Sequence, residues 1–138
     1  LSTAVGAAMV TNKLVYLFIG DVAFFYDRNA LWNNYLPKNL RIIVFNNKGG
    51  GIFRLIDGPA SQPELEEFFE TKQNLSAKLT VEEANFDYFS ASNLKGIKDC
   101  IQEFNSPIGN SKCLEIFTEG KINQAEFASF LKAVKRNS

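Results

Sequence analysis

The sequence predicts an α/β fold, a three-layer α/β/α sandwich around a mostly parallel sheet. Two continuous apolar runs, at 14–20 and 40–45, are typical of strands that are buried on both faces of such a sheet. Segments with helical spacing lie between the apolar runs, and this alternation is the pattern of α/β domains. With 138 residues, 46% of them hydrophobic, the chain has the length and apolar content of a single domain.

The elements of the first half are placed by composition and by start and stop residues. Ala and Gly dominate 2–12, which favours a helix packed closely on the sheet with Ser2 or Thr3 as its N-cap. A second helix is expected between the two strands, capped by Asp27 and ending near Leu36, before Pro37.

A long connection at 52–75 follows the second strand, and connections of this length are usually functional or mobile. It is expected to contain a turn at 57–59 and a short helix that Pro63 opens. The next predicted elements, in order, are a short helix from Ser76 to about Ala84, a strand at 86–89, a helix with Leu94, Ile97, Ile101 and Phe104 on its buried face, and a strand at 113–119.

The last helix is expected to begin at Asn123. Glu126 stands three residues after Asn123, as in a capping box with Asn in the cap position. Phe127, Phe130, Leu131 and Val134 give this helix one apolar face, and Lys132, Lys135 and Arg136 suit the dipole at its end.

The charge balance bears on which main partner the chain could bind. Fifteen basic and fifteen acidic residues give a net charge of zero, which argues against nucleic acid or an anionic membrane surface. The sequence has no apolar run near 18 residues and no secretory signal, so we expect a cytoplasmic protein without a membrane span.

The chain contains no histidine, and Cys100 and Cys113 are its two cysteines. A Cys/His zinc site and a Ser-His or Cys-His catalytic pair are therefore excluded within this chain. The two cysteines stand 13 residues apart without a CxxC motif and are expected to be reduced thiols packed in a core.

Two polar turns follow the two apolar strands. The first contains Gly20 and Asp21, and the second reads Asn-Asn-Lys-Gly-Gly-Gly at 46–51. Parallel strands joined by a right-handed crossover place both turns at the carboxyl edge of the sheet, where open α/β sheets bind ligands. The Asp21 carboxylate, the Asn47 amide oxygen and the Gly49 carbonyl could supply three oxygen ligands to Mg²⁺, with diphosphate oxygens and water completing six.

Other features of the turns support a phosphate ligand. The backbone amides of Val22 and Ala23 begin the helix after Asp21 and would add positive potential there. The glycines at 49–51 would allow the backbone to curl at φ values closed to other residues. Taken singly, each turn is also ordinary loop chemistry, and the sequence has neither a Walker-type loop nor a GxGxxG fingerprint.

A Gly-Asp followed after about 25 residues by Asn-Asn resembles the metal-and-diphosphate motif of thiamine-diphosphate enzymes. The longer stretch from GDVAFFYDRNAL to NNKGGGIF is similar to one branch, the 2-succinyl-5-enolpyruvyl-6-hydroxy-3-cyclohexene-1-carboxylate synthases of menaquinone biosynthesis. The resemblance covers residues 1–56 well and continues thinly to the end. It implies the thiamine-diphosphate-binding fold.

The resemblance also implies a set of site residues. Asp21, Asn47 and Gly49 would bind Mg²⁺ or Mn²⁺, the amides of Val22 and Ala23 would lie near the diphosphate, and Ile52 and Phe53 would line the pocket beside the thiazolium ring, although plain core packing is an equal alternative for these last two. The chain departs from the family pattern at Val22, which replaces a glycine, at Lys48, which replaces a frequent asparagine, and at 70–73, to which no role is transferred.

The implied enzyme is a transferase that decarboxylates 2-oxoglutarate and adds the succinyl-semialdehyde carbanion to isochorismate, as a homo-oligomer. Since the chain starts at Leu1 rather than Met, we expect residues 1–138 to be a single-domain, C-terminal fragment of a multidomain enzyme. The cofactor-protonating glutamate would lie in the enzyme's own N-terminal domains, usually in a second subunit. No catalytic residue is assigned here, because Glu64, Glu66, Glu67, Glu82 and Glu83 are expected to be solvated. The fragment alone is therefore expected to be inactive and to self-associate through apolar patches.

Two alternatives remain open from the sequence. One is another thiamine-diphosphate enzyme, of the acetolactate-synthase or 2-oxoacid-decarboxylase type, which would share the metal motif. The other is a non-catalytic α/β module for some other phosphate ligand, in which Asp21 only caps a helix.

Overall fold

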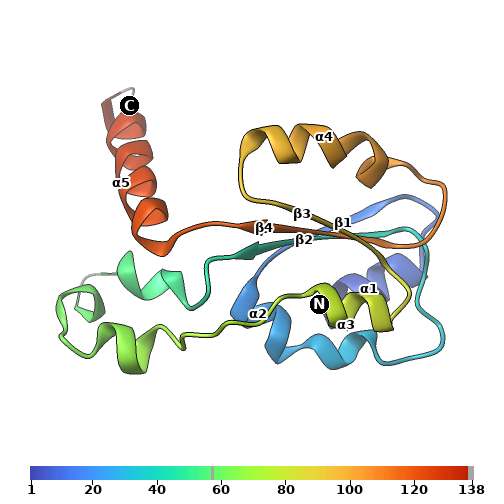
Figure 1. Ribbon diagram of the computed structural model, residues 1–138, viewed down its shortest axis with the longest axis horizontal. Helices are drawn as coiled ribbons and strands as arrows, with labels where there is room; N and C mark the ends of the chain where they lie inside the picture. The colour runs from blue at the N-terminus through green and yellow to red at the C-terminus, as the bar shows by residue number, and fades with distance from the viewer. Residues whose placement is uncertain (57, 137–138) are drawn as a thin grey trace.

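The computed structural model describes residues 1–56 and 58–136. In this part of the chain, four parallel strands form one sheet in the order β1-β2-β4-β3 (Figure 1). The strands are β1 (Val15–Gly20), β2 (Leu40–Asn46), β3 (Asp87–Ala91) and β4 (Lys112–Phe117). Helices lie on both faces of the sheet, so the predicted three-layer α/β sandwich is confirmed.

One face of the sheet is covered by α1 (Ser2–Met9), α2 (Asp21–Tyr26) and α3 (Lys78–Glu83), and the other by α4 (Leu94–Asn105) (Figure 1). Each face has its own hydrophobic cluster. The larger cluster contains Phe24, Leu40, Ile42, Val44 and Val81 on the three-helix face. The smaller one packs Phe104 of α4 against Ile43, Ala91 and Leu114.

The two strands predicted to be buried on both faces differ in how far their side chains are buried. Strand β2 lies in the interior of the sheet and is buried along nearly all of its length. Strand β1 lies at the edge, and its residues alternate between partly buried and exposed. Tyr16 and Phe18 are 43% and 64% exposed. The prediction of full burial is therefore right for β2 and wrong for β1.

Helix α1 lacks the predicted side-chain cap, and the helix predicted from Asp27 is shorter than expected. Helix α1 has Leu1 at its N-cap, without a side-chain cap from Ser2 or Thr3. Instead, the Ser2 backbone N–H donates to Asp27 Oδ2 over 2.7 Å. Helix α2 begins at Asp21, directly after β1, and Asp27 is its C-terminal flanking residue. Asp27 flanks the start of the next element as predicted, but without a side-chain cap, and that element is a 3₁₀ turn, η1 (Arg28–Leu31), which ends before Leu36. The Asp27 carboxylate accepts from Ser2 instead.

The 52–75 connection is built from short irregular helices, η2 (Gly51–Arg54), η3 (Pro59–Ser61) and the π-helical η4 (Leu65–Phe69). The helix predicted after Pro63 is present as η4, whereas Asp57 of the predicted turn lies outside the described residues. Gly58, also in that turn, has a positive φ of 97°. The chain then returns to the sheet through α3, β3 and α4 in the predicted order.

Helix α4 begins as an Asn-capped helix, since Asn93 Oδ1 accepts a hydrogen bond from the Gly96 N–H at 2.9 Å. Phe104 is fully buried as predicted, but Leu94 at the first turn is exposed. At the other end, two buried cations cover the helix carbonyls: Arg41 donates to the Ser106 carbonyl and Lys112 to the Glu103 carbonyl. Cations are favourable at this end of a helix dipole.

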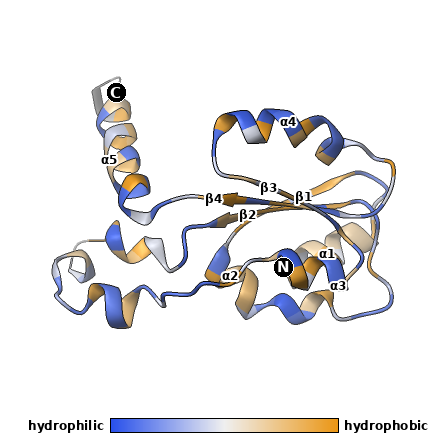
Figure 2. Ribbon diagram, in the orientation of Figure 1, coloured by the Kyte–Doolittle hydropathy of each residue, from blue (hydrophilic) through white to orange (hydrophobic). Residues whose placement is uncertain are grey.

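Helix α5 (Gly120–Arg136) begins three residues before the predicted start. Asn123 lies in its first turn and donates from Nδ2 to the Thr118 hydroxyl at 2.9 Å, so it is not the cap. The helix projects beyond the carboxyl edge of the sheet rather than over it (Figure 1). Hydrophobic and hydrophilic residues alternate along it (Figure 2), and Phe127, Phe130, Leu131 and Val134 of the predicted apolar face are exposed.

Both cysteines are free thiols, as predicted. Cys113 is buried in the larger cluster, where burial raises the pKa of its thiol, and Cys100 packs against the smaller one. Among residues 1–56 and 58–136, no helix is long and apolar enough to cross a membrane.

Candidate functional site

The two polar turns meet at one edge of the sheet, as the parallel topology predicts. Strands β1 and β2 pair up to Gly20 and Phe45, so that Asp21, directly after β1, lies beside Asn46, the last residue of β2. The Asn46 carbonyl accepts from the Thr118 N–H at 2.9 Å, which adds the end of β4 to the same edge. Three turns from distant parts of the sequence therefore surround one place.

Asp21 is the buried centre of this edge, with only 2% of its surface exposed. Its Oδ2 atom accepts two hydrogen bonds, from the Gly49 N–H at 2.9 Å and from Gln73 Nε2 at 2.6 Å. Buried carboxylates need such partners, because an unpaired charge is costly away from water. The pair of donors on Oδ2 fixes the carboxylate and directs Oδ1 elsewhere.

The other oxygen of Asp21 belongs to a convergent group of oxygens. The Gly49 carbonyl oxygen and Asp21 Oδ1 both face the Asn47 side-chain amide, at 2.6 and 3.3 Å, and its NH₂ group donates to both. Turned over, the amide would add its own oxygen to these two, and carboxylate, carbonyl and amide oxygens are the ligands that Mg²⁺ prefers.

The chemical types of the candidate metal ligands also fit Mg²⁺. Within the described residues there is no cluster of three or more His, Cys, Asp or Glu side chains that could hold a metal. The ligand set at Asp21, Asn47 and Gly49 has one carboxylate, one amide and one backbone carbonyl. This all-oxygen set with a single charge leaves room for phosphate oxygens in the coordination shell, as is usual for protein-bound Mg²⁺.

The glycine-rich turn is required for close packing rather than for unusual φ angles. A Cβ atom on Gly49 would lie 2.7 Å from the Glu70 carbonyl oxygen, and one on Gly51 would displace the end of the Asn47 side chain. The residue in the left-handed region is Lys48, with φ 63°. The prediction of glycine-only φ values at 49–51 is therefore wrong, since the positive-φ glycines of the described chain are Gly58 and Gly109.

Segment 70–73, to which the sequence assigned no role, forms one wall of the site. The Glu70 carbonyl accepts from the Gly50 N–H, and the Gln73 N–H donates to the Lys48 carbonyl at 3.2 Å. These bonds hold the Gln73 side chain against Asp21. No sequence signal marks Gln73, because it follows an irregular connection and belongs to no motif.

The same segment is anchored by charges. Glu70 is buried and forms an ion pair with Arg54, which also pairs with Glu66 at 2.9 Å. Lys72 pairs with Glu66 at 2.7 Å, and the two cations, Lys72 first, lower the pKa of Glu66 to about 2. Glu66 is thus exposed but ion-paired, while Glu64, Glu67, Glu82 and Glu83 are exposed as predicted.

A cavity of about 570 Å³ opens beside the converging oxygens. It is lined by all of the sequence-predicted site residues, Asp21, Val22, Ala23, Asn47, Gly49, Ile52 and Phe53, together with residues that the sequence did not single out for the site, among them Tyr26, Phe45, Thr118, Asn123 and Gln124. Ile52 is 59% exposed, so core packing does not describe it in this structure. Phe53 contacts the Phe69 ring with centroids 5.7 Å apart.

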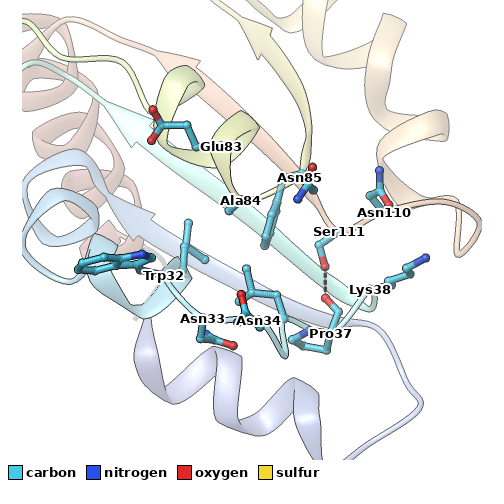
Figure 3. Close-up of a pocket in the computed structure, with 13 residues that line it drawn as sticks. Trp32, Asn33, Asn34, Pro37, Lys38, Glu83, Ala84, Asn85, Asn110 and Ser111 are labelled. Carbon is cyan, nitrogen blue, oxygen red and sulfur yellow. Dashed lines mark hydrogen bonds between the residues drawn. The ribbon is translucent and has the colours of Figure 1, made fainter.

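A second cavity, of about 350 Å³, lies at the opposite, amino edge of the sheet (Figure 3). Amide side chains surround it, and Ser111 donates a hydrogen bond to the Pro37 carbonyl at 2.6 Å within it. Trp32 lies at one end of this cavity, on the loop before β2. None of the predicted site residues lines it.

No protein-family model matches the chain. Curated relatives, however, match nearly all of it. The 2-succinyl-5-enolpyruvyl-6-hydroxy-3-cyclohexene-1-carboxylate synthase of Cytophaga hutchinsonii is 48% identical over 137 residues, which are 99% of this chain. The synthases of that name from Christiangramia forsetii and Flavobacterium psychrophilum are 46% and 40% identical, over 96% and 95% of the chain.

The chain spans 24% of the length of each of these three relatives. Similarity therefore extends well beyond residues 1–56, where the motif lies, and includes the irregular connection, the last strand and α5. The predicted resemblance is confirmed: over nearly its whole length, this chain is a homologue of a quarter-length segment of the 2-succinyl-5-enolpyruvyl-6-hydroxy-3-cyclohexene-1-carboxylate synthases.

Proposed function

We propose that this chain is the domain of a thiamine-diphosphate-dependent synthase that binds the cofactor's diphosphate through Mg²⁺ or Mn²⁺. The observation that carries the proposal is the convergence of the Asn47 amide on the Gly49 carbonyl oxygen and on Asp21 Oδ1, at 2.6 and 3.3 Å. Homology to named synthases of this type gives the convergence a chemical context.

In this proposal, Asp21, Asn47 and Gly49 hold the metal ion. The Val22 and Ala23 amides lie in the first turn of α2 beside it and line the same cavity, where they would face the diphosphate. Ile52 and Phe53 form an apolar wall of that cavity, which would exclude water from the reacting end of the cofactor. When bound, thiamine diphosphate supplies a nucleophilic carbon and an electron sink, and the protein's contribution is orientation and electrostatics.

The whole enzyme would act on 2-oxoglutarate and isochorismate, joining them with loss of carbon dioxide. The described residues offer no assigned acid–base group at the cavity, so the glutamate that the family requires would come from other domains or a second subunit. The 138-residue chain alone is therefore expected to lack activity. Turnover of both substrates by this chain in isolation would contradict the proposed division of roles.

The test uses calorimetry on the full-length enzyme with thiamine diphosphate and Mg²⁺. Asp21→Ala should abolish metal-dependent cofactor binding, because it removes the only carboxylate of the ligand set. Asp99→Ala, which changes an exposed carboxylate on α4, is the matched control and should bind as the wild type does. Equal binding by wild type and Asp21→Ala would refute the site.

The alternatives give different outcomes in the same experiments. A non-catalytic phosphate-binding module would bind no thiamine diphosphate in a metal-dependent way. Another thiamine-diphosphate enzyme would bind it but would not consume 2-oxoglutarate in an isochorismate-dependent reaction. Measuring 2-oxoglutarate decarboxylation with and without isochorismate separates this outcome from the proposed synthase.

A further inference from the structure

Glu115 is a fully buried carboxylate on the central strand β4. Four hydrogen-bond donors, rather than a cation, hold its carboxylate. Oε1 accepts from Asn46 Nδ2 at 2.7 Å and from the Ala77 N–H at 3.0 Å. Oε2 accepts from the Ser76 hydroxyl at 2.6 Å and from the Tyr88 hydroxyl at 2.7 Å. An apolar residue of similar volume often serves stability as well as a buried charge does, so stability alone does not account for this carboxylate.

The first consequence of Glu115 is a fixed orientation of the Asn46 amide. Both N–H groups of Asn46 Nδ2 are used, one on Glu115 and one on the Leu75 carbonyl at 3.0 Å. The amide oxygen must therefore point toward the polar turn. There it accepts from the Lys48 N–H at 3.1 Å and from Gln73 Nε2 at 3.2 Å.

The second consequence is a fixed orientation of the Gln73 amide. Its Oε1 accepts from the Leu75 N–H, and its Nε2 is shared between Asn46 Oδ1 and Asp21 Oδ2. An amide has only one donor end, so holding Oε1 and Nε2 in this way allows a single orientation. Gln73 thus transmits the orientation of Asn46 to Asp21.

At Asp21, the donors from Gln73 and the Gly49 N–H both occupy Oδ2. The oxygen that remains, Oδ1, is the one that faces Asn47. The chain of hydrogen bonds from Glu115 through Asn46 to Gln73 therefore determines which oxygen of Asp21 faces Asn47. Partners of this kind behind metal ligands typically change metal affinity 10–100-fold when they are removed.

We propose that Glu115 is a positioning residue of the metal site, acting through Asn46 and Gln73 to present Asp21 Oδ1 as a ligand. This inference rests on the proposed function, since it assigns a role within the same metal site. Glu115 itself does not line the cavity, and none of its four hydrogen-bond donors belongs to Asp21, Asn47 or Gly49.

The test measures Mn²⁺ binding to the full-length enzyme at fixed thiamine diphosphate, from the electron paramagnetic resonance signal of free Mn²⁺. Glu115→Leu should weaken Mn²⁺ binding by about 10- to 100-fold. Glu115→Gln should stay near the wild-type value, because its amide oxygen can still accept from Asn46 and Ala77. Its NH₂ group would then face the Ser76 and Tyr88 hydroxyls, which can act as acceptors.

Tyr88→Phe is the matched control for stability. It removes the donor to Glu115 Oε2 and leaves the hydrogen bond from Asn46 to Glu115 Oε1 in place. The midpoint of thermal unfolding should fall, while Mn²⁺ affinity should not change. A merely structural role for Glu115 predicts instead that folded Glu115→Leu binds Mn²⁺ as tightly as the wild type, and that result would overturn the inference.

If Glu115→Leu does not fold, Gln73→Met tests the same relay, which is the chain of hydrogen bonds from Glu115 through Asn46 and Gln73 to Asp21. Gln73 is only partly buried, and the substitution removes its bonds to both Asn46 and Asp21. Weakened Mn²⁺ binding supports the relay, and wild-type affinity refutes it. If the wild-type enzyme itself bound no Mn²⁺ with thiamine diphosphate, the proposed function would fail first, which distinguishes the two failures.

Discussion

The backbones of Gly49 and Glu70 touch, so that a Cβ atom on Gly49 would lie 2.7 Å from the Glu70 carbonyl oxygen. This contact joins the polar turn after β2 to the end of the long connection. It explains why the wall that carries Gln73 stands against Asp21. The site therefore depends on a close approach of two backbones as well as on its polar side chains.

Gly49→Ala is expected to destabilise the chain by about 1–3 kcal/mol, because overpacking forces the backbones apart. The Gly49 carbonyl would move with its backbone, so metal binding should weaken as well. Chemical unfolding and Mn²⁺ titration check the two effects. Gly6→Ala on α1 is the control, since its Cβ would meet nothing within 4 Å; it should stabilise the helix by about 0.5–1 kcal/mol. Equal stability of Gly49→Ala and wild type would contradict the contact.

Arg54→Met is expected to destabilise the connection more than loss of an exposed ion pair does. Glu70, its main partner, is 6% exposed, and its carboxylate would be left buried without a cation. We expect a loss of about 3–5 kcal/mol in the free energy of unfolding. Lys72→Met is the comparison, because its pair with Glu66 is exposed on both sides and should contribute less than about 1 kcal/mol. Equal losses in the two variants would refute the buried character of the Arg54 pair.

The sequence predicted best those features that are set by residues close together in the chain. The apolar strands, their parallel order and the meeting of Asp21 with Asn47 follow from patterns within 14–51, and all are confirmed. Their metal-binding role stays a prediction. Gln73 and Glu115 were missed because they belong to no motif themselves and lie 52 and 69 residues from their partners Asp21 and Asn46. Glu115 in particular lies in an apolar strand pattern, where a single charge gives no sign of its donors.

Helix boundaries were the least predictable part for a similar reason. Asp27 is a good cap in isolation, but Ser2 from α1 engages its carboxylate, and α2 starts directly after β1. Asn123 likewise has the composition of a cap but lies inside α5. For Asp27, a contact distant in sequence decided between two acceptable local structures.

The stability of the chain should fall between pH 10 and about pH 12 through Tyr88. Burial raises the pKa of Tyr88 to about 12, and the neighbouring Glu115 carboxylate adds to the shift. The folded state therefore holds this proton more tightly than the unfolded chain does. The contribution is complete below pH 10 and is lost as pH rises to about 12. Unfolding curves across this range should decline less steeply for Tyr88→Phe, and parallel curves would contradict the shift.

The exposed apolar face of α5 gives the last prediction. Phe127, Phe130 and Leu131 are exposed on a helix that projects from the sheet edge (Figure 1), and Phe130 is 61% exposed. Exposed apolar patches of this kind favour association, so the 138-residue chain should self-associate as its concentration rises. Light scattering should show this association reduced by Phe130→Glu. Leu79→Glu, which adds the same charge at an exposed apolar residue of α3, should leave it unchanged. A strict monomer at high concentration, or equal effects of the two variants, would show that α5 is not the associating surface.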